Sequence, residues 1–317
     1  MSHDPVSGDP TAASGRRRVL AFGLLGLLVL VVVLGLLRPD GPASGDPPAT
    51  AAELDWGRAP ALLLAGLCTG LLAGMTRMGG GVPKIAFMLI LLHFDFYFAR
   101  AVALATLFLE SVMVLRGFLR AGLVVWPVAS RMLLLAVPAS VVAALLGNWM
   151  PPAILALSFG VFCLFLALHT AAFIPGDSEE RDVSRDGKLP LDERGRYQAG
   201  VLGGLHGTIC GLFGVSGGVI ATPLQQVLLH VPRRNAVANT LLVATVVTLV
   251  AGAIVMWTGI AGRHFTVSDV LIVDVCMGSG SAAGVAIGKR LAEHCSVTGP
   301  RLLLALFTGA AGLYLVL

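Results

Sequence analysis

Long apolar runs, separated by short polar stretches, are the dominant pattern of this sequence. The first run covers residues 19–37 and follows a polar stretch that ends in Arg16, Arg17 and Arg18. Apolar runs of about 20 residues that do not alternate with polar positions are typical of membrane-spanning helices and not of the strands of a membrane barrel. Ten further apolar segments cover approximately residues 59–75, 82–98, 101–118, 131–148, 152–174, 198–213, 218–231, 236–258, 267–288 and 301–317.

Composition points to the same class of protein. The chain is 56% hydrophobic and 13% charged, and its mean hydropathy is +0.86. Soluble domains carry about 25% charged residues, so this chain has too few charges to cover a surface that faces water. We therefore predict an all-α, polytopic membrane protein. The five cysteines lie singly, without a Cys-x-x-Cys pair, and we expect them to pack as small apolar side chains.

The polar interruptions divide the chain into six parts. The apolar run at 19–37 has 19 residues, whereas the hydrophobic part of a signal peptide has about 7–15. We therefore favour a retained helix over the alternative, a signal peptide cut near Ala43-Ser44-Gly45. The predicted parts are a cytoplasmic tail (1–18), an N-terminal transmembrane helix (19–38), a linker (39–58), a first transmembrane repeat (59–174), a cytoplasmic linker (175–197) and a second transmembrane repeat (198–317).

The distribution of Lys and Arg predicts an orientation. If all eleven segments cross the membrane and the N-terminus is cytoplasmic, most Lys and Arg residues lie on the cytoplasmic side. Cytoplasmic loops carry such an excess, so we predict a multi-pass protein of the inner membrane, with its N-terminus in the cytoplasm and its C-terminus outside. The charges that this scheme leaves outside are Arg38, Arg58, Arg100 and Arg263.

Two glycine-rich stretches interrupt apolar segments at corresponding places. The first runs from Thr76 to Lys84 and contains three adjacent glycines; the second runs from Leu212 to Pro223. Because five segments belong to each half, the second half enters the membrane upside down relative to the first, which is the inverted-repeat arrangement of many transporters. An offset of 137 residues pairs Gly70 with Gly207, Gly74 with Gly211, Gly80 with Gly217 and Gly81 with Gly218.

The doubled motif resembles the glycine-rich motif of the TauE/SafE family. The resemblance covers residues from about 60 to 317 and includes an Ala-Val-Ala pattern that follows each break. It implies a membrane transporter of sulfite or organosulfonate anions that works by alternating access. The second copy fits the motif well, whereas the first has Arg77 and Lys84 where the second has Gly214 and Ala221.

A broken helix exposes backbone N–H groups at the start of its second part, and these groups suit an oxyanion. The alternative for the glycines is close packing of helices through small residues, and the alternative for the polar residues is hydrogen bonding between helices. The residues that we predict to bind substrate are Arg77, Gly79, Gly80, Gly81, Lys84, Thr106, Ser216, Gly217, Gly218, Asn239 and Thr240.

Lys84, Glu110 and Asp274 are ionisable residues inside predicted spans. A Lys at the centre of a span costs about 2.5–3.5 kcal/mol on insertion scales, so we expect Lys84 to attract the anion, unless its chain extends from a helix end to the membrane surface. Arg77 either assists it or is a cytoplasmic topology charge. Glu110 and Asp274 are candidates for an ion pair or for a coupled proton; Glu110 is placed to pair with Lys84 or Arg77, and Asp274 has a wet position near a helix end as its alternative.

Other functions are less well supported by the sequence. Gly214-Val215-Ser216-Gly217-Gly218 fits Gly-x-Ser-x-Gly, so an intramembrane serine protease that uses Ser216 is the alternative function. However, apolar helix-like runs flank the motif, which needs a strand before it. His206, ten residues back, and His230, near the end of a segment, are poor candidates for its base. A non-transporting assembly factor is a third. There is no GxxxxGK[ST] stretch and no metal-spaced His/Cys set. We therefore expect secondary or facilitative transport without a cofactor or a metal. The expected partners are a small anion and the lipid bilayer, with no nucleic acid; coupling to a proton or sodium ion and the oligomeric state are left open.

Overall fold

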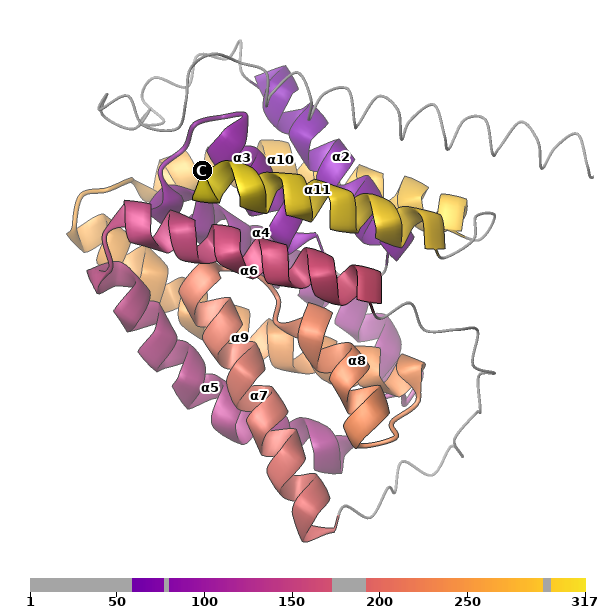
Figure 1. Cartoon of the computed structure of the whole chain (residues 1–317). Helices are drawn as coiled ribbons and strands as arrows, with labels where there is room; N and C mark the ends of the chain where they lie inside the picture. The colour runs from indigo at the N-terminus through magenta and orange to yellow at the C-terminus, as the bar shows by residue number, and fades with distance from the viewer. Residues whose placement is uncertain (1–58, 77–79, 173–191, 293–297) are drawn as a thin grey trace, which may run out of the picture.

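The computed structural model describes residues 59–76, 80–172, 192–292 and 298–317. This part of the chain is all-α and contains ten helices, one for each apolar segment predicted after residue 58 (Figure 1). The predicted N-terminal helix and most of the linker at 175–197 lie outside the described residues. The helices are α2 (Ala59–Thr76), α3 (Gly81–Ile90), α4 (Phe96–Arg120), α5 (Trp126–Trp149), α6 (Pro152–Ala172), α7 (Glu193–Phe213), α8 (Gly218–Leu228), α9 (Arg233–Ala261), α10 (Val267–Ala292) and α11 (Thr298–Val316).

The two helices that follow the breaks are short. Helix α3 has 10 residues and α8 has 11, which corresponds to lengths of about 15 and 17 Å. The hydrocarbon core of a bilayer is about 30 Å thick, so neither helix crosses it alone. The expectation that residues 82–98 form one span is therefore wrong, because Asp95 accepts a hydrogen bond from the Tyr97 backbone N–H at 3.0 Å and starts α4 there. The count of eleven crossings included residues 82–98 and 218–231 as full spans and is corrected with them. The cytoplasmic N-terminus stays a prediction.

Helices from the two predicted halves pack on each other in a reciprocal way. Helix α2 packs along α10 and α5 along α7, while α4 contacts α9 and α6 contacts α11. In the order of the two five-segment halves, α2 corresponds to α7 and α10 to α5, so the two main pairs are the same pair with the halves exchanged. This arrangement agrees with an internal repeat; its inversion across the membrane stays a prediction.

Glycines make the α2–α10 and α5–α7 contacts close. A Cβ atom at Gly70 would lie 2.2 Å from the Ser281 carbonyl oxygen, and one at Gly207 would lie 2.0 Å from that of Ala136. These two glycines therefore let the backbones of crossing helices touch, which is the packing role that small residues have in membrane bundles. The same role belongs to Gly66, Gly74, Gly203, Gly211, Gly280, Gly284 and Gly288.

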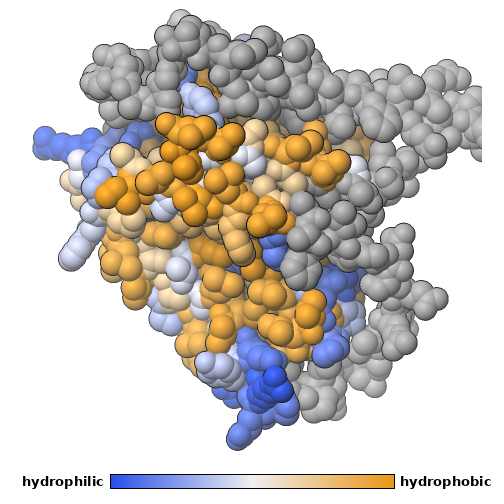
Figure 2. Space-filling model, viewed as in Figure 1, coloured by the Kyte–Doolittle hydropathy of each residue, from blue (hydrophilic) through white to orange (hydrophobic). Residues whose placement is uncertain are grey.

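The surface of the bundle is apolar, as a lipid-facing surface must be. Large hydrophobic side chains project from the outer helices, among them Leu168 and Val275, and Figure 2 shows hydrophobic residues over the helices, with hydrophilic ones gathered at the tip where α7 begins. Trp126 and Trp149, at the two ends of α5, are exposed, as expected at the two membrane interfaces. Five of the described helices are long and apolar enough to cross a membrane. The predicted class, an all-α polytopic membrane protein, is confirmed.

Candidate functional site

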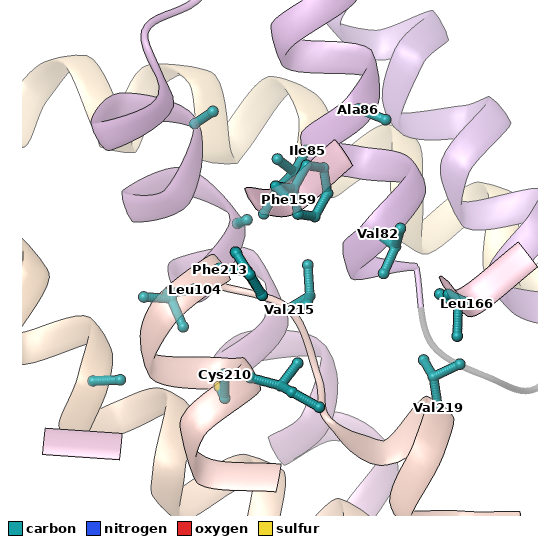
Figure 3. Packing of buried hydrophobic residues seen from close by; sticks show 14 of the residues in the cluster. Val82, Ile85, Ala86, Leu104, Phe159, Leu166, Cys210, Phe213, Val215 and Val219 are labelled. Carbon is teal, nitrogen blue, oxygen red and sulfur yellow. The ribbon is translucent and has the colours of Figure 1, made fainter. Parts of the chain in front are cut away.

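The start of α3 lies against the residues between α7 and α8 in the core. We call the residues between α2 and α3 (77–80) the first break and those between α7 and α8 (214–217) the second break; Arg77 and Gly79 lie outside the described residues. Gly81, the first residue of α3, is so close to the second break that a Cβ atom on it would lie 3.3 Å from Val215 Cα. Figure 3 shows the apolar side chains around this meeting point, including Val82 and Val215.

Each break also packs on the helix that precedes it. A Cβ atom at Gly80 would lie 3.3 Å from the Thr69 carbonyl oxygen, and one at Gly217 would lie 2.5 Å from His206 Cα. Thr69 and His206 are related by the same 137-residue offset as the two glycines. The predicted correspondence between the breaks therefore holds for their local packing.

A charged cluster follows the first break by one helical turn. Lys84 on α3 is only 1% exposed, and its Nζ donates to Glu110 Oε1 on α4 at 2.9 Å; the Glu110 side chain is 22% exposed. Ser281 on α10 donates to the same Glu110 oxygen at 2.6 Å. The structure thus places Lys84 and Glu110 in an ion pair, one of the two pairings that the sequence offered for Glu110.

Asp274 is a second acidic residue on the helices that hold this cluster. It is buried on α10, and the Thr106 hydroxyl on α4 is hydrogen bonded to its Oδ1. The same hydroxyl lies 2.8 Å from the Val102 carbonyl oxygen, which it reaches as a donor. The Thr106 hydroxyl therefore has two acceptors within reach, Asp274 Oδ1 and the Val102 carbonyl oxygen, and the Asp274 side chain is buried between the helices. The position at the wet end of a helix, which the sequence left open for Asp274, is therefore wrong.

The second predicted half contains a neutral counterpart of this cluster. Gln225 on α8 accepts from Asn239 Nδ2 on α9 at 3.2 Å and donates to Thr240 Oγ1 at 2.9 Å. Asn239 also accepts from the backbone N–H of Val125, at the start of α5, at 2.8 Å. Helices α8, α9 and α5 correspond to α3, α4 and α10, so the two networks join corresponding helices, although Gln225 lies four residues past the position that matches Lys84. The predicted residues Asn239 and Thr240 thus hydrogen bond between helices, and Gln225 was missed because a single Gln near a helix end gives no sequence signal.

The glycines and Ser216 at the second break are engaged within the protein. The Gly218 N–H donates to Ser216 Oγ at 3.2 Å, and a Cβ atom at Gly218 would lie 2.5 Å from Thr240 Cγ2. His206 packs on this break, closer than its sequence separation suggested, but neither of its ring nitrogens has a hydrogen-bond partner among the described residues. An activated serine needs a hydrogen bond to its base, so the pair supplies no support for the protease alternative.

Arg100 is the functional candidate that the sequence interpretation missed. It was expected in a loop outside the membrane, but α4 begins at Phe96, so Arg100 lies in the second turn of a buried helix and is 0% exposed. Its Nη1 donates to Asn148 Oδ1 at 3.2 Å, and its Nη2 donates to the carbonyl oxygens of Ala144 (2.9 Å) and Gly211 (2.6 Å). Asp95, a helix-capping residue five positions earlier, was the signal that could have moved the start of α4 and placed Arg100 inside it.

Comparison with known proteins adds a family. The family model described as "Sulfite exporter TauE/SafE" matches residues 11–129 and 96–315, so the match begins before residue 60, where the resemblance was expected to start. A probable membrane transporter protein, MamO, of Paramagnetospirillum magneticum is 27% identical, over 63% of this chain and 34% of that protein. MamO of Magnetospirillum gryphiswaldense is also 27% identical, over 62% and 33%. The chain thus spans about one third of the length of these relatives. No solved structure matches it.

Proposed function

Because the chain belongs to the sulfite exporter TauE/SafE family of membrane transporters, we propose that it carries a small sulfur oxyanion, sulfite or an organosulfonate, across the inner membrane. In this proposal transport is secondary or facilitative, the two halves alternate in opening their shared site to either side, and the N-terminus is cytoplasmic. The description of the family names the substrate class, and the meeting of two broken helices in the core supports the mechanism.

The observation that carries the proposal is the buried cluster of Lys84, Glu110 and Asp274 beside the first break. Ionisable residues inside a membrane bundle are costly and mark substrate or ion pathways by default. A protein that only needed to fold could fill these positions with apolar residues at no loss, because replacing a buried ion pair by packed hydrophobic side chains is often neutral or stabilising. The cluster therefore supports transport over the assembly-factor alternative.

The ion pair suggests how an anion and a proton are coupled. While Glu110 is ionised, it neutralises Lys84 at 2.9 Å and leaves no net positive charge for a substrate. When Glu110 takes up a proton, the ammonium group of Lys84 loses its counter-charge in a medium where an unpaired charge is unfavourable. An oxyanion entering at the first break restores that counter-charge. The proposed cycle therefore moves the anion together with a proton, and the Asp274–Thr106 hydrogen bond provides a second place to hold a proton.

Sulfite flux into proteoliposomes tests this proposal. We expect wild-type flux to saturate with sulfite and to increase when the proton gradient points in the direction of flux. Lys84→Met should lower the flux by at least about tenfold, because it removes a charge whose loss costs more than 1.4 kcal/mol. Glu110→Gln should keep Lys84 permanently unpaired and abolish the response to the gradient.

Arg116→Gln is the matched control, because Arg116 is an exposed cation on the same helix as Glu110, and it should transport like the wild type. Equal fluxes for the wild type and Lys84→Met would exclude the role of Lys84. A wild-type flux that ignores the gradient would exclude proton coupling, and an absence of flux for sulfite and for ethanesulfonate in folded protein would exclude the substrate class.

A further inference from the structure

Arg100 is a buried cation whose described hydrogen-bond partners are all neutral. The guanidinium is 0% exposed, and its acceptors are the side-chain amide of Asn148 and the carbonyl oxygens of Ala144 and Gly211. No described carboxylate forms a salt bridge with it, and its Nε has no hydrogen-bond partner among the described residues. Because a guanidinium stays protonated in proteins, this position keeps a positive charge that the described part of the protein solvates but does not neutralise.

Two glycines lie against the Arg100 side chain, Gly147 at the guanidinium and Gly214 at its aliphatic part. A Cβ atom at Gly147 would lie 2.6 Å from Arg100 Nη1, and one at Gly214 would lie 2.9 Å from Arg100 Cγ. Gly214 also has a φ of 75°, which side chains rarely tolerate. Two separate glycines therefore give Arg100 the room that it occupies, one from α5 and one from the second break.

Arg100 also lies near the place where the start of α3 meets the second break. It contacts Gly214, the first residue of the second break, and the next residue, Val215, is the one that faces Gly81 at the start of α3. Because Arg100 is 0% exposed, a ligand reaches its guanidinium only if the second break moves away from α4. Broken helices at midplane are where transporters place their substrates, and Arg is the side chain whose N–H fork matches the oxygens of an oxyanion.

We propose that Arg100 binds the oxyanion group of the substrate at the second break, as a fixed cationic site distinct from the titratable Lys84–Glu110 pair. This inference rests on the proposed function for the identity of the ligand, a –SO₃⁻ group with its oxygens toward Nε and Nη1. The anion supplies the counter-charge that Asn148, Ala144 and Gly211 do not.

Asn148→Asp is the decisive variant, because it places a carboxylate where the amide oxygen lies 3.2 Å from Arg100 Nη1. The new carboxylate neutralises the guanidinium from inside the protein. Thr258 accepts from Asn148 Nδ2 at 2.6 Å in the wild type and donates to the Ile254 carbonyl oxygen at 2.8 Å, so its hydroxyl turns from Ile254 to the carboxylate in the variant. If Arg100 only stabilises the packing of its helices, its hydrogen bonds to neighbouring residues should be at least as strong in this variant as in the wild type. If Arg100 binds the substrate, the new carboxylate should replace the anion as its counter-charge and weaken anion binding.

The experiment measures the binding of sulfite, ethanesulfonate, phosphate and chloride to the full chain in detergent, by the rise in unfolding temperature with anion concentration. We expect saturable binding of sulfite and ethanesulfonate by the wild type. Asn148→Asp and Arg100→Gln should raise the apparent Kd by at least about tenfold, and Arg100→Lys should raise it less. Without anion, Asn148→Asp should unfold at or above the wild-type temperature. Arg116→Gln, which removes an exposed charge from the same helix, is the control and should leave Kd unchanged.

The outcomes separate this inference from the proposed function. Wild-type affinity in Asn148→Asp, or no oxyanion binding by the wild type, would overturn the Arg100 site. If Arg100→Gln does not fold, Asn148→Asp and Arg100→Lys still decide. Binding that depends on Arg100 but is followed by no flux into proteoliposomes would support the site and reject transport. Flux and binding that are unchanged in all three variants would support transport and reject the site.

Discussion

The Lys84–Glu110 pair allows a quantitative test of how charge is held in the core. Lys84 is 1% exposed and Glu110 22% exposed, so each side chain is screened little by water. Removing one partner of a buried pair leaves the other unpaired and costs about 3–5 kcal/mol, whereas replacing both is often neutral. We therefore expect Lys84→Met and Glu110→Gln each to lower the free energy of unfolding by about 3 kcal/mol, with the smaller loss for Glu110→Gln because Glu110 is nearer to solvent.

The double variant should be at least as stable as the more stable single variant, which corresponds to a coupling energy of about 3 kcal/mol or more. Unfolding induced by SDS in mixed micelles, followed by tryptophan fluorescence, measures all four free energies. Losses that add in the double variant would show that the two charges do not interact, and would refute both the ion pair and the coupling mechanism built on it. A single Glu110→Gln variant as stable as the wild type would show instead that Lys84 has another counter-charge.

Two further predictions concern packing and pH. Gly207→Ala should lower the free energy of unfolding by about 1–3 kcal/mol, because the new Cβ would lie 2.0 Å from the Ala136 carbonyl oxygen, whereas Gly117→Ala, which has open space around it, should be neutral or stabilising in the same assay. Burial raises the pKa of the Asp95 carboxyl, against the lowering effect of hydrogen bonds from backbone N–H groups such as that of Tyr97. Its contribution to stability is therefore greatest at acidic pH and is lost as the pH rises through the raised pKa. Asp95→Asn, which keeps an oxygen for the helix cap, should remove this pH dependence of the unfolding temperature, and an unchanged pH profile would contradict it.

The positions of the helices and of the two breaks were predictable because each depends on a local property. Apolar runs mark segments that leave water, and three adjacent glycines, or Gly-Gly beside Ser216, mark a backbone that cannot continue a helix cheaply. Lys84 and Glu110 were foreseeable as partners because each is a costly charge in an apolar run. Arg100 could not be predicted in this way, because it lies between the apolar segments 82–98 and 101–118, where a charged residue is usually part of a loop.

The exact boundaries of each helix and its tertiary neighbours could not be predicted from the sequence. The run at 82–98 is apolar throughout apart from Lys84, His93 and Asp95, so hydropathy joins a half-length helix, a turn and the first turn of α4 into one span. The glycines of α2 and α7 had two explanations, and only the distance to the crossing helix separates them: Gly70 and Gly207 serve packing. The role of Gln225 depends on its hydrogen bonds to Asn239 and Thr240 of the next helix, which the sequence does not reveal.

The network around Lys84 is charged and the one around Gln225 is neutral. This difference in charge gives a reason for the two halves of an internal repeat to differ in sequence. Two identical halves would present the same charges to an anion from either side, and no proton would distinguish the two states. Here α3 carries Lys84, four residues past the first break, where α8 has Ala221, and the cluster of Gln225, Asn239 and Thr240 is neutral. In the proposed cycle, the titratable charge is confined to one break, and the permanent charge of Arg100 lies beside the other. The gain or loss of one proton at Glu110 then changes the preference for an anion at the first break and leaves the second unchanged, so proton movement sets the direction of transport.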